Sequence, residues 1–494
     1  MATQTYSELL AHIKQTTALQ QAAGVLSWDQ EVMMPKKGAD ARAEQMGALE
    51  SALHERRTDP RVGEWLAKLN GAALGPAELR NVELTRRAYD RATKVPARLA
   101  EELARLTARA QGIWAEARAA NRFEDFAPTL ATVIDLKREE AAAIAAEGQS
   151  HYDALLNDFE PGMTTEVLSP LLESLRPRLS ALRQRIAESG MKKVQLNGTF
   201  PTDAQLKLAR VMADNVGYDW EAGRLDLSVH PFSSGTGGDS RITTRVDETE
   251  PFGCLYSTQH ELGHALYEQG VPVDHAFTPV GQHVSMGVHE SQSRLWENQI
   301  GRSRAYAEWF YPKFVQAFGA SGLKDAGDLY RVLNSVETGF IRTESDEVHY
   351  NLHILLRFEL ERDLIGGALQ VSDLEVAWND RFQRDFGVAV PDAANGVLQD
   401  VHWSVGLFGY FPTYSLGNIY AAQLNEKLRS DVPNLDDQIS AGDTSAVLNW
   451  LRKHVHEHGS LYEPAELMER ASGEEISVEP LLNYLESKYA KVVS

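Results

Sequence analysis

The segment STQHELGHALYEQG, residues 257–270, constrains this chain most, because it requires a buried helix that carries two histidines four positions apart. Positions i and i+4 lie on the same face of an α-helix, so His260 and His264 can reach one ion. Zinc accepts neutral imidazole, and a catalytic zinc site commonly has three protein ligands and a water. Glu261 is offset around the helix and can act as general base on that water. The spacing therefore predicts a hydrolytic metal site.

A third protein ligand has to come from elsewhere in the chain. The pattern in which H-x-x-G-x-x-H starts at the second histidine fails, because Tyr267 and Gly270 replace its glycine and its last histidine. Another class takes a glutamate from a later helix, and Glu290 in GVHESQSRLWENQ follows His264 by 26 positions. A helical hairpin would bring Glu290 to face the two histidines. The alternatives are residues that we expect to support the site or lie on the surface: His289, Glu268 and Glu297.

Charge and cysteine content narrow the class of protein. Among 494 residues, 49 are basic and 70 acidic, which gives a formal charge of −21. Nucleic acids and anionic membranes both need a basic face, so neither is an expected partner. The single cysteine, Cys254, excludes an intrachain disulfide and is expected to be a small buried side chain rather than a zinc ligand. Without a signal-peptide core or a long apolar run, the sequence predicts a cytoplasmic protein.

Hydrophobic periodicity predicts a mostly α protein. The segments 96–123 and 126–148 are rich in Ala, Leu, Glu and Arg with apolar residues near a 3.6-residue period. Alternating β-branched residues predict short strands in KKVQLNGTF, 192–200, and SRITTRVDE, 240–248, with a glycine-rich loop at 230–241 between them. We expect a single domain over 1–494, as one body or as two lobes, with a helical part to about 190 and a metal-site part beyond it. A small sheet should lie beside the HELGH helix.

Several further motifs resemble those of the M32 family of metallocarboxypeptidases, the carboxypeptidase Taq type. HELGH is followed by HESQS, and DSRIT, at 239–243, is similar to the family's D-x-R-x-T. HPF at 230–232 and GVLQDVHW at 396–403 also match family patterns. IRTESD at 341–346 resembles I-R-x-x-A-D, with Ser345 in place of alanine. The segments 26–45 and 481–492 look like the family's ends, so the resemblance covers nearly the whole chain.

The resemblance implies a fold, an activity and a cofactor. Relatives are mostly helical, surround a deep groove that holds the metal, and are similar in fold to neurolysin and angiotensin-converting enzyme. They remove single amino acids from the C-terminus of peptides, and they usually form homodimers. Zinc is the implied ion, and cobalt often supports activity as well. Short peptides with a free C-terminal carboxylate are therefore the expected substrates.

An exopeptidase has to hold the terminal carboxylate of its substrate, and a planar guanidinium pairs with a carboxylate through two parallel hydrogen bonds. Arg342 and Arg241 lie in motif positions and are the candidates. For Arg241, an ion pair with Asp239 or Asp247 is the competing interpretation.

The developing oxyanion needs a donor besides the ion. Candidates lie in the aromatic run that ends GLFGYFPTYSLGN, and they are His402, Tyr414 and Tyr410, although aromatic rings in such a run also serve as core. His230 is expected to contact either substrate or backbone. Two other functions are compatible with the HExxH pattern alone: an oligopeptidase or endopeptidase with the same metal site, and a non-catalytic helical scaffold.

Overall fold

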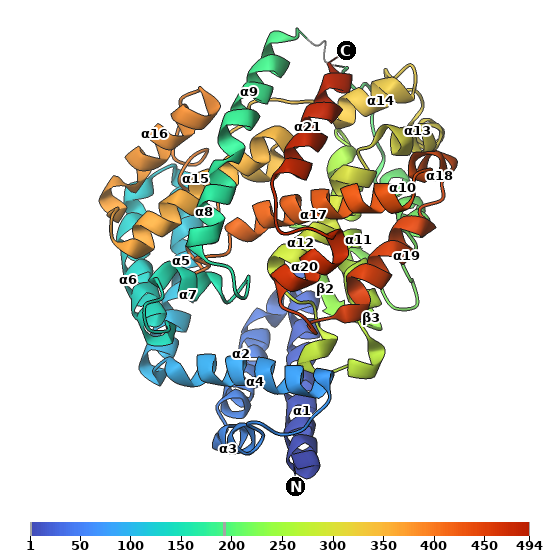
Figure 1. Ribbon diagram of the computed structural model, residues 1–494. Helices are drawn as coiled ribbons and strands as arrows, with labels where there is room; N and C mark the ends of the chain where they lie inside the picture. The colour runs from blue at the N-terminus through green and yellow to red at the C-terminus, as the bar shows by residue number, and fades with distance from the viewer. Residues whose placement is uncertain (1, 191–193, 494) are drawn as a thin grey trace.

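The computed structural model describes residues 2–190 and 194–493, and its helices surround one small sheet (Figure 1). The first four helices lie together at one end of the molecule (Figure 1). They are α1 (Ala2–Val32), α2 (Ala39–Arg57), α3 (Pro60–Lys68) and α4 (Pro76–Lys94). A small apolar core holds α1, α3 and α4 together, while α2 packs against α1. This core is formed by Tyr6, Leu9, Ile13, Val62, Leu66, Leu69 and Val82.

A second group of helices follows, and it includes the two helices predicted by range. These helices are α5 (Ala97–Ala120), α6 (Ala127–Ile144), α7 (His151–Leu156), α8 (Thr165–Glu173), α9 (Leu175–Glu188) and α10 (Thr202–Val216). The helices predicted at 96–123 and 126–148 are confirmed as α5 and α6. Asn121 ends α5 in the left-handed region at φ 56°, a conformation that asparagine tolerates and that terminates helices.

The sheet has three strands: β1 (Leu225–Leu227), β2 (Ser233–Thr236) and β3 (Asp239–Thr244). Their order is β1-β3-β2, with β1 parallel and β2 antiparallel to the central β3. Thr244 on β3 donates from its hydroxyl to the carbonyl oxygen of Cys254, at 2.9 Å, which attaches the sheet to the next helix. The predicted small sheet beside the HELGH helix is therefore confirmed.

Two details of the strand prediction are wrong. Residues 194–200 form no strand; Asn197 instead donates to the carbonyl oxygen of Ser321, and Phe200 to that of Glu248. Residues 192 and 193 lie outside the described part of the chain. The segment 230–241 is also more than a loop, because β2 runs through it. The glycines in this segment favoured the prediction of a loop, but Gly235 pairs with Ser240 in the sheet although its φ is 96°.

The remaining helices complete the molecule. They are α11 (Phe252–Gly270), α12 (Met286–Arg294), which continues as a π-helical turn (Leu295–Ile300), α13 (Arg304–Phe318), α14 (Ala326–Leu333), α15 (Glu347–Gly366), α16 (Leu374–Phe386), α17 (Pro412–Asp431), α18 (Leu435–Ala441), α19 (Ser445–His454), α20 (Pro464–Ser472) and α21 (Glu479–Val492). One large apolar core extends from Ala110 to Val492. In it α12 packs between α11 and α17 at the centre of the molecule, and the C-terminal α21 lies beside α9 (Figure 1).

The mostly α fold predicted from the sequence is confirmed. Over the described residues, no helix combines the length and apolarity needed to span a bilayer. Cys254, which we expected to be a small buried side chain, is buried on α11.

Candidate metal centre

Three side chains from two helices converge at the centre of the molecule. The Nε2 atoms of His260 and His264 on α11 are 3.2 Å apart. The Oε2 atom of Glu290 on α12 lies 3.7 Å from the first of these nitrogens and 3.4 Å from the second. Each residue thus offers one ligand atom toward a common point. Four tetrahedral ligands at about 2.0–2.2 Å from an ion lie about 3.3 Å from one another, so the three atoms fit a divalent ion.

Two glycines allow the helices to approach this closely. A Cβ on Gly263 would lie 2.4 Å from the Cα of Ser293 on α12, so only glycine permits this contact between α11 and α12. On the other side, a Cβ on Gly417 of α17 would lie 2.4 Å from the Cγ of Glu290. Helix α12 is therefore held between two glycine faces with its glutamate turned toward the histidines. Glycine at position 263 makes helix α11 less stable than alanine would, by about 1 kcal/mol, but alanine would prevent this close packing.

The far nitrogen of His260 is held by a carboxylate. Its Nδ1 donates to Glu297 Oε2 at 2.9 Å, and Glu297 also pairs with Arg294 and Arg302. Such a carboxylate fixes the imidazole so that the other nitrogen faces the ion. Glu297, one of the alternative ligands, therefore contacts a histidine of the cluster rather than completing the cluster itself.

The far nitrogen of His264 is held through a second imidazole. Its Nδ1 lies 2.5 Å from Nδ1 of His289, whose Nε2 lies 2.9 Å from Glu268 Oε1. His283 completes this row, with Nδ1 also 2.9 Å from Glu268 Oε1. The other two alternative ligands thus lie behind His264. Sequence reasoning missed His283, because only the fold brings the loop before α12 against the end of α11.

Burial and charge set the ionisation of the cluster. Burial raises the pKa of Glu261 to about 7; the His260 charge opposes this shift and the nearby Glu290 and Glu297 charges add to it. Burial also disfavours the ionised form of Glu290, but the Arg294 and His260 charges hold its pKa well below the usual range. One carboxyl group is therefore a firm anion, while its neighbour can exchange a proton near neutrality, as a general base has to.

Aromatic side chains continue from the cluster toward Arg342. The guanidinium of Arg294, which pairs with Glu290, lies 4.3 Å from the ring centre of Tyr350. The Tyr350 hydroxyl accepts from Nη1 of Arg342 at 3.2 Å. Tyr414 lies beside them: Arg342 is 4.9 Å from its ring centre. His402 Nε2 lies 3.2 Å from the Tyr414 hydroxyl, and the rings of Tyr410 and Tyr414 are 5.3 Å apart. One region therefore contains four of the predicted residues: Arg342, His402, Tyr410 and Tyr414.

Arg342 does not stand alone in this region. Its guanidinium lies 3.0 Å from Asp400 Oδ1, and the guanidinium of Arg357 lies 2.6 Å from Asp400 Oδ2. Burial and the Arg342 charge lower the pKa of Arg357 to about 10, against the opposing pull of Asp400. Two buried cations therefore share one carboxylate, which leaves a surplus positive charge. Arg357 was missed because nothing in the helical pattern around it marks it as buried.

Arg241 and His230 lie elsewhere. Arg241 on β3 forms two hydrogen bonds with Asp239, at 2.7 and 2.8 Å, and stacks on Trp28 of α1 at 4.3 Å. The competing interpretation, an ion pair with Asp239, matches this geometry. His230 is exposed in the loop before β2. The structure therefore brings neither residue into the region that contains Arg342.

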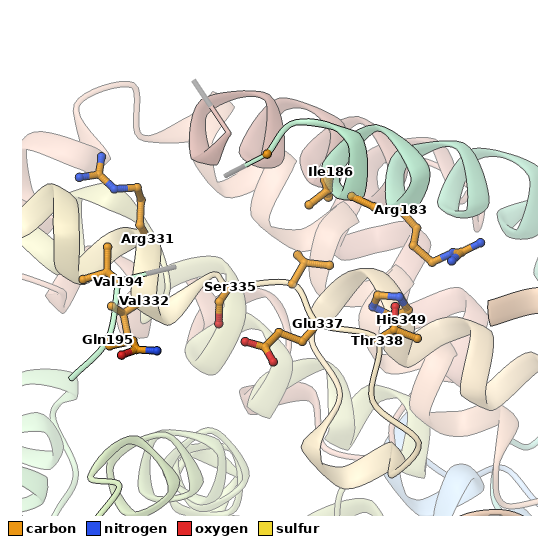
Figure 2. Close-up of a pocket in the computed structure, with 13 residues that line it drawn as sticks. Arg183, Ile186, Val194, Gln195, Arg331, Val332, Ser335, Glu337, Thr338 and His349 are labelled. Atoms are coloured by element: carbon orange, nitrogen blue, oxygen red, sulfur yellow. The ribbon is translucent and has the colours of Figure 1, made fainter. Parts of the chain in front are cut away.

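A separate cavity of about 410 Å³ lies between α9, the end of α14 and the loop before α15 (Figure 2). Arg183, Arg331, Glu337 and His349 are among its lining residues, and none of the predicted site residues is. Figure 2 shows the guanidinium groups of Arg183 and Arg331 directed to opposite sides, so they do not converge on one anion. The metal cluster, rather than this cavity, carries the candidate chemistry.

Comparison with known proteins agrees with the resemblance found in the sequence. The family model described as carboxypeptidase Taq (M32) metallopeptidase matches residues 8–489. The chain is 44% identical to thermostable carboxypeptidase 1 of Thermus thermophilus, covering 98% of both chains, and 36% identical to carboxypeptidase 1 of Bacillus subtilis, covering 97% of both. It superimposes with a TM-score of 0.96 on the M32 carboxypeptidase of Deinococcus radiodurans, at 36% identity and 99% coverage of both chains. Metallocarboxypeptidase 1 of Trypanosoma cruzi gives the same TM-score at 35% identity, covering 98% of this chain and 99% of that one.

Proposed function

The chain belongs to the carboxypeptidase Taq (M32) family and is a metal-dependent carboxypeptidase acting on peptides, and we propose which of its residues perform the reaction. His260, His264 and Glu290 hold the divalent ion. The observation that carries this assignment is the convergence of their three ligand atoms within 3.7 Å of one another. Two imidazoles and a carboxylate suit zinc, and they accept cobalt as well.

Glu261 is the general base. A bound ion would lower the pKa of a coordinated water and polarise the scissile carbonyl. The Glu261 carboxylate then takes a proton from the attacking water and returns it to the leaving amine, which restores the starting state. Its burial supports this role, because a pKa of about 7 lets the carboxyl group accept and release a proton at neutral pH.

Arg342 holds the terminal carboxylate of the peptide. Asp400 is shared with Arg357, so one of the two cations lacks a full counter-charge. A substrate carboxylate would supply that charge. The position also fits, since two side chains, Tyr350 and Arg294, connect Arg342 to the proposed ligand Glu290.

Tyr414 donates to the oxyanion. Burial keeps the pKa of its hydroxyl well above the usual value, so the hydroxyl keeps its proton. Burial lowers the pKa of His402 to about 3, so this ring is neutral and carries a single N–H. Its Nδ1 is buried without a partner among the described residues, which puts the proton on Nε2, facing Tyr414. The tyrosine oxygen then accepts from His402, and its own hydrogen, which is donated to the Tyr410 hydroxyl, turns to the substrate when a peptide binds.

Two wider properties follow from the family resemblance and are proposals as well: a homodimer and a cytoplasmic location. Light scattering after size-exclusion chromatography tests the first, with twice the 54.8 kDa mass of one chain as the expected result.

The experiment that tests the proposed site uses paired peptides that differ only in a free or amidated C-terminus. After chelation and return of Zn²⁺ or Co²⁺, mass spectrometry should record stepwise loss of single residues from the free peptide alone. Glu261→Gln should abolish this loss while one ion per chain stays bound, because glutamine cannot take the proton. Internal cuts in both peptides would favour the endopeptidase, and unchanged turnover in Glu261→Gln would reject the general base.

A further inference from the structure

A second group with the same three ligand types lies directly behind the first. Glu268 at the end of α11, His283 in the loop before α12, and His289 on α12 offer ligand atoms within 4.8 Å of one another. Both histidines face the same oxygen, Glu268 Oε1, at 2.9 Å. Two imidazoles and one carboxylate form a donor set that zinc and related divalent ions accept. Glu268 and His289 hold His264, and His283 has no role in the mechanism proposed above.

This second group has a route to solvent. A cavity of about 370 Å³ opens between α1 and β2, and its lining includes Glu268, His283 and Gln282 together with Thr236. The His283 side chain is 31% exposed, whereas Glu268 is nearly fully buried. An ion can therefore arrive from the cavity side and meet one accessible imidazole before the buried carboxylate. Ligand types, ligand number and an access route are three of the requirements of a metal site.

We propose that Glu268, His283 and His289 form a second divalent-ion site, and that an ion bound there displaces the catalytic one. The second part rests on the proposed role of His264 as a catalytic ligand. Inhibition by excess metal is thus built into the fold, through two sites that share one line of imidazoles.

The exclusion follows from counting protons. Nδ1 of His264 and Nδ1 of His289 are 2.5 Å apart, so only one proton fits between them. When His264 uses Nε2 for the catalytic ion, its proton is on Nδ1, and His289 has to accept there and carry its own proton on Nε2, toward Glu268. An ion at the second site takes the Nε2 lone pair of His289 and moves that proton to Nδ1. His264 then has to accept at Nδ1, and its proton moves to Nε2, where the catalytic ion would bind.

The two sites should also differ in affinity. Ligand atoms of the catalytic site are already 3.2–3.7 Å apart, close to the spacing around a tetrahedral ion. In the second group, two hydrogen bonds of 2.9 Å have to be broken and the atoms have to separate before an ion enters. The catalytic site should therefore fill first, and the second only when free metal is in excess.

The test uses His283→Asn in the full-length enzyme. Asparagine can still donate to Glu268, but its amide nitrogen is not a metal ligand. His275→Asn is the matched control, because His275 lies in the same loop and outside the cluster. Metal-depleted wild type, variant and control are titrated with Zn²⁺, while bound metal is counted by equilibrium dialysis and mass spectrometry and activity is followed in parallel. A Co²⁺ titration adds the visible absorption of each bound ion as a readout independent of turnover.

Wild type and His275→Asn should gain activity with the first equivalent of Zn²⁺ and lose at least tenfold at higher concentrations, with a change in the Co²⁺ spectrum at the same point. His283→Asn should reach the same maximal activity and keep it over at least a tenfold wider range of metal concentration. Loss of inhibition in the control as well, or inhibition unchanged in His283→Asn, would overturn the second site. Activity with one equivalent and no inhibition in wild type would also overturn it, yet leave the proposed function intact. Failure to bind any ion would reject the proposed function itself.

Discussion

Arg342 and Arg241 were both predicted from the sequence as candidates to bind a substrate carboxylate, but they lie in two regions with different surroundings. In the Arg342 region, formed by Arg342, Arg357, Asp400 and Tyr414, the Arg342 and Asp400 side chains are 7% and 10% exposed. In the Arg241 face, formed by Trp28, Asp239 and Arg241, the two charged side chains are 19% and 54% exposed. One region is enclosed, and the other is open to solvent.

The balance of charge differs as well. Arg241 has its own carboxylate in a complete two-bond pair, so it needs no further anion. Arg342 shares Asp400 with Arg357, so that region stays one negative charge short. A buried surplus charge is costly unless a partner arrives, whereas an exposed ion pair contributes little either way. The missing counter-charge, rather than the motif that contains it, is therefore the property that distinguishes Arg342 from Arg241.

Replacing Arg342 tests the comparison most strongly. Arg342→Ala should lower kcat/KM for a peptide with a free C-terminus by about 10³-fold, or about 4 kcal/mol, because a desolvated contact to the carboxylate is lost. The free energy of unfolding should change by less than this amount, because Asp400 keeps Arg357 as its partner. Steady-state kinetics measure the effect, with amidated peptide as the reference. A loss below tenfold would remove Arg342 from carboxylate binding.

Removing the shared carboxylate should have the opposite signature. Asp400→Asn leaves two buried guanidinium groups without a counter-charge, so the free energy of unfolding should fall by about 3 kcal/mol. Asp239→Asn, the equivalent change at the Arg241 face, should cost less than about 1 kcal/mol. Urea denaturation of the two variants compares them directly. Equal losses would mean that the two regions do not differ in burial as described.

Tyr414→Phe examines the donor beside Arg342. Removing one hydroxyl that stabilises the oxyanion should reduce kcat by about 10²-fold and leave KM nearly unchanged, because the contact forms only in the transition state. Phenylalanine keeps the ring against Arg342, so stability should be preserved. An effect on KM alone would instead make Tyr414 a substrate-binding side chain.

A pH dependence of stability should come from Glu361, a buried carboxyl group beside the Arg342 region. Glu361 accepts from the Tyr152 hydroxyl, the Trp403 indole N–H and the backbone N–H of Gly409, and burial raises its pKa to about 7. A raised pKa means that the folded state keeps a proton that the unfolded state releases. This stabilisation is complete below the unfolded pKa of about 4.3 and is lost as pH rises through 7.

Glu361→Gln should therefore reduce the fall in unfolding free energy between pH 5 and pH 7 by about 2 kcal/mol, because glutamine does not titrate. Denaturation curves at three pH values measure it. Asp239→Asn serves as the control for the loss of an exposed carboxylate elsewhere in the chain. If the unfolding free energy of Glu361→Gln changed with pH as it does in the wild type, the Glu361 carboxyl group would be ionised throughout the range from pH 5 to pH 7.

Arg241→Ala is expected to have the smallest effect. Loss of an exposed ion pair and of a stack on Trp28 should cost less than about 1 kcal/mol of stability. Activity should stay within about threefold of wild type, because the guanidinium is already satisfied by Asp239. Kinetics with free and amidated peptides provide the comparison. A loss as large as that of Arg342→Ala would assign the carboxylate to the Arg241 face instead.

Local chemistry determined a large part of this protein. The i and i+4 spacing of His260 and His264 places both on one face of α11, since that relation depends only on the helix. The 3.6-residue period at 96–123 and 126–148 predicted α5 and α6 for the same reason. Recognition of the family came from ordered motifs along the chain, and these also depend on sequence alone.

Tertiary structure decided what surrounds those local elements. The row from His264 through His289 to Glu268 joins the end of one helix to a loop and the next helix, so no periodicity reveals it. Glycines hid β2, whose pairing with β3 depends on residues outside the strand itself. The sequence predicted Arg342 and Arg241 as equal candidates. They differ in burial and in the carboxylates around them, and both of these properties depend on the folded structure. The spacing of residues along a helix depends on the local sequence, so it can be predicted from the sequence. The net charge of a buried site depends on residues from distant segments, which only folding brings together.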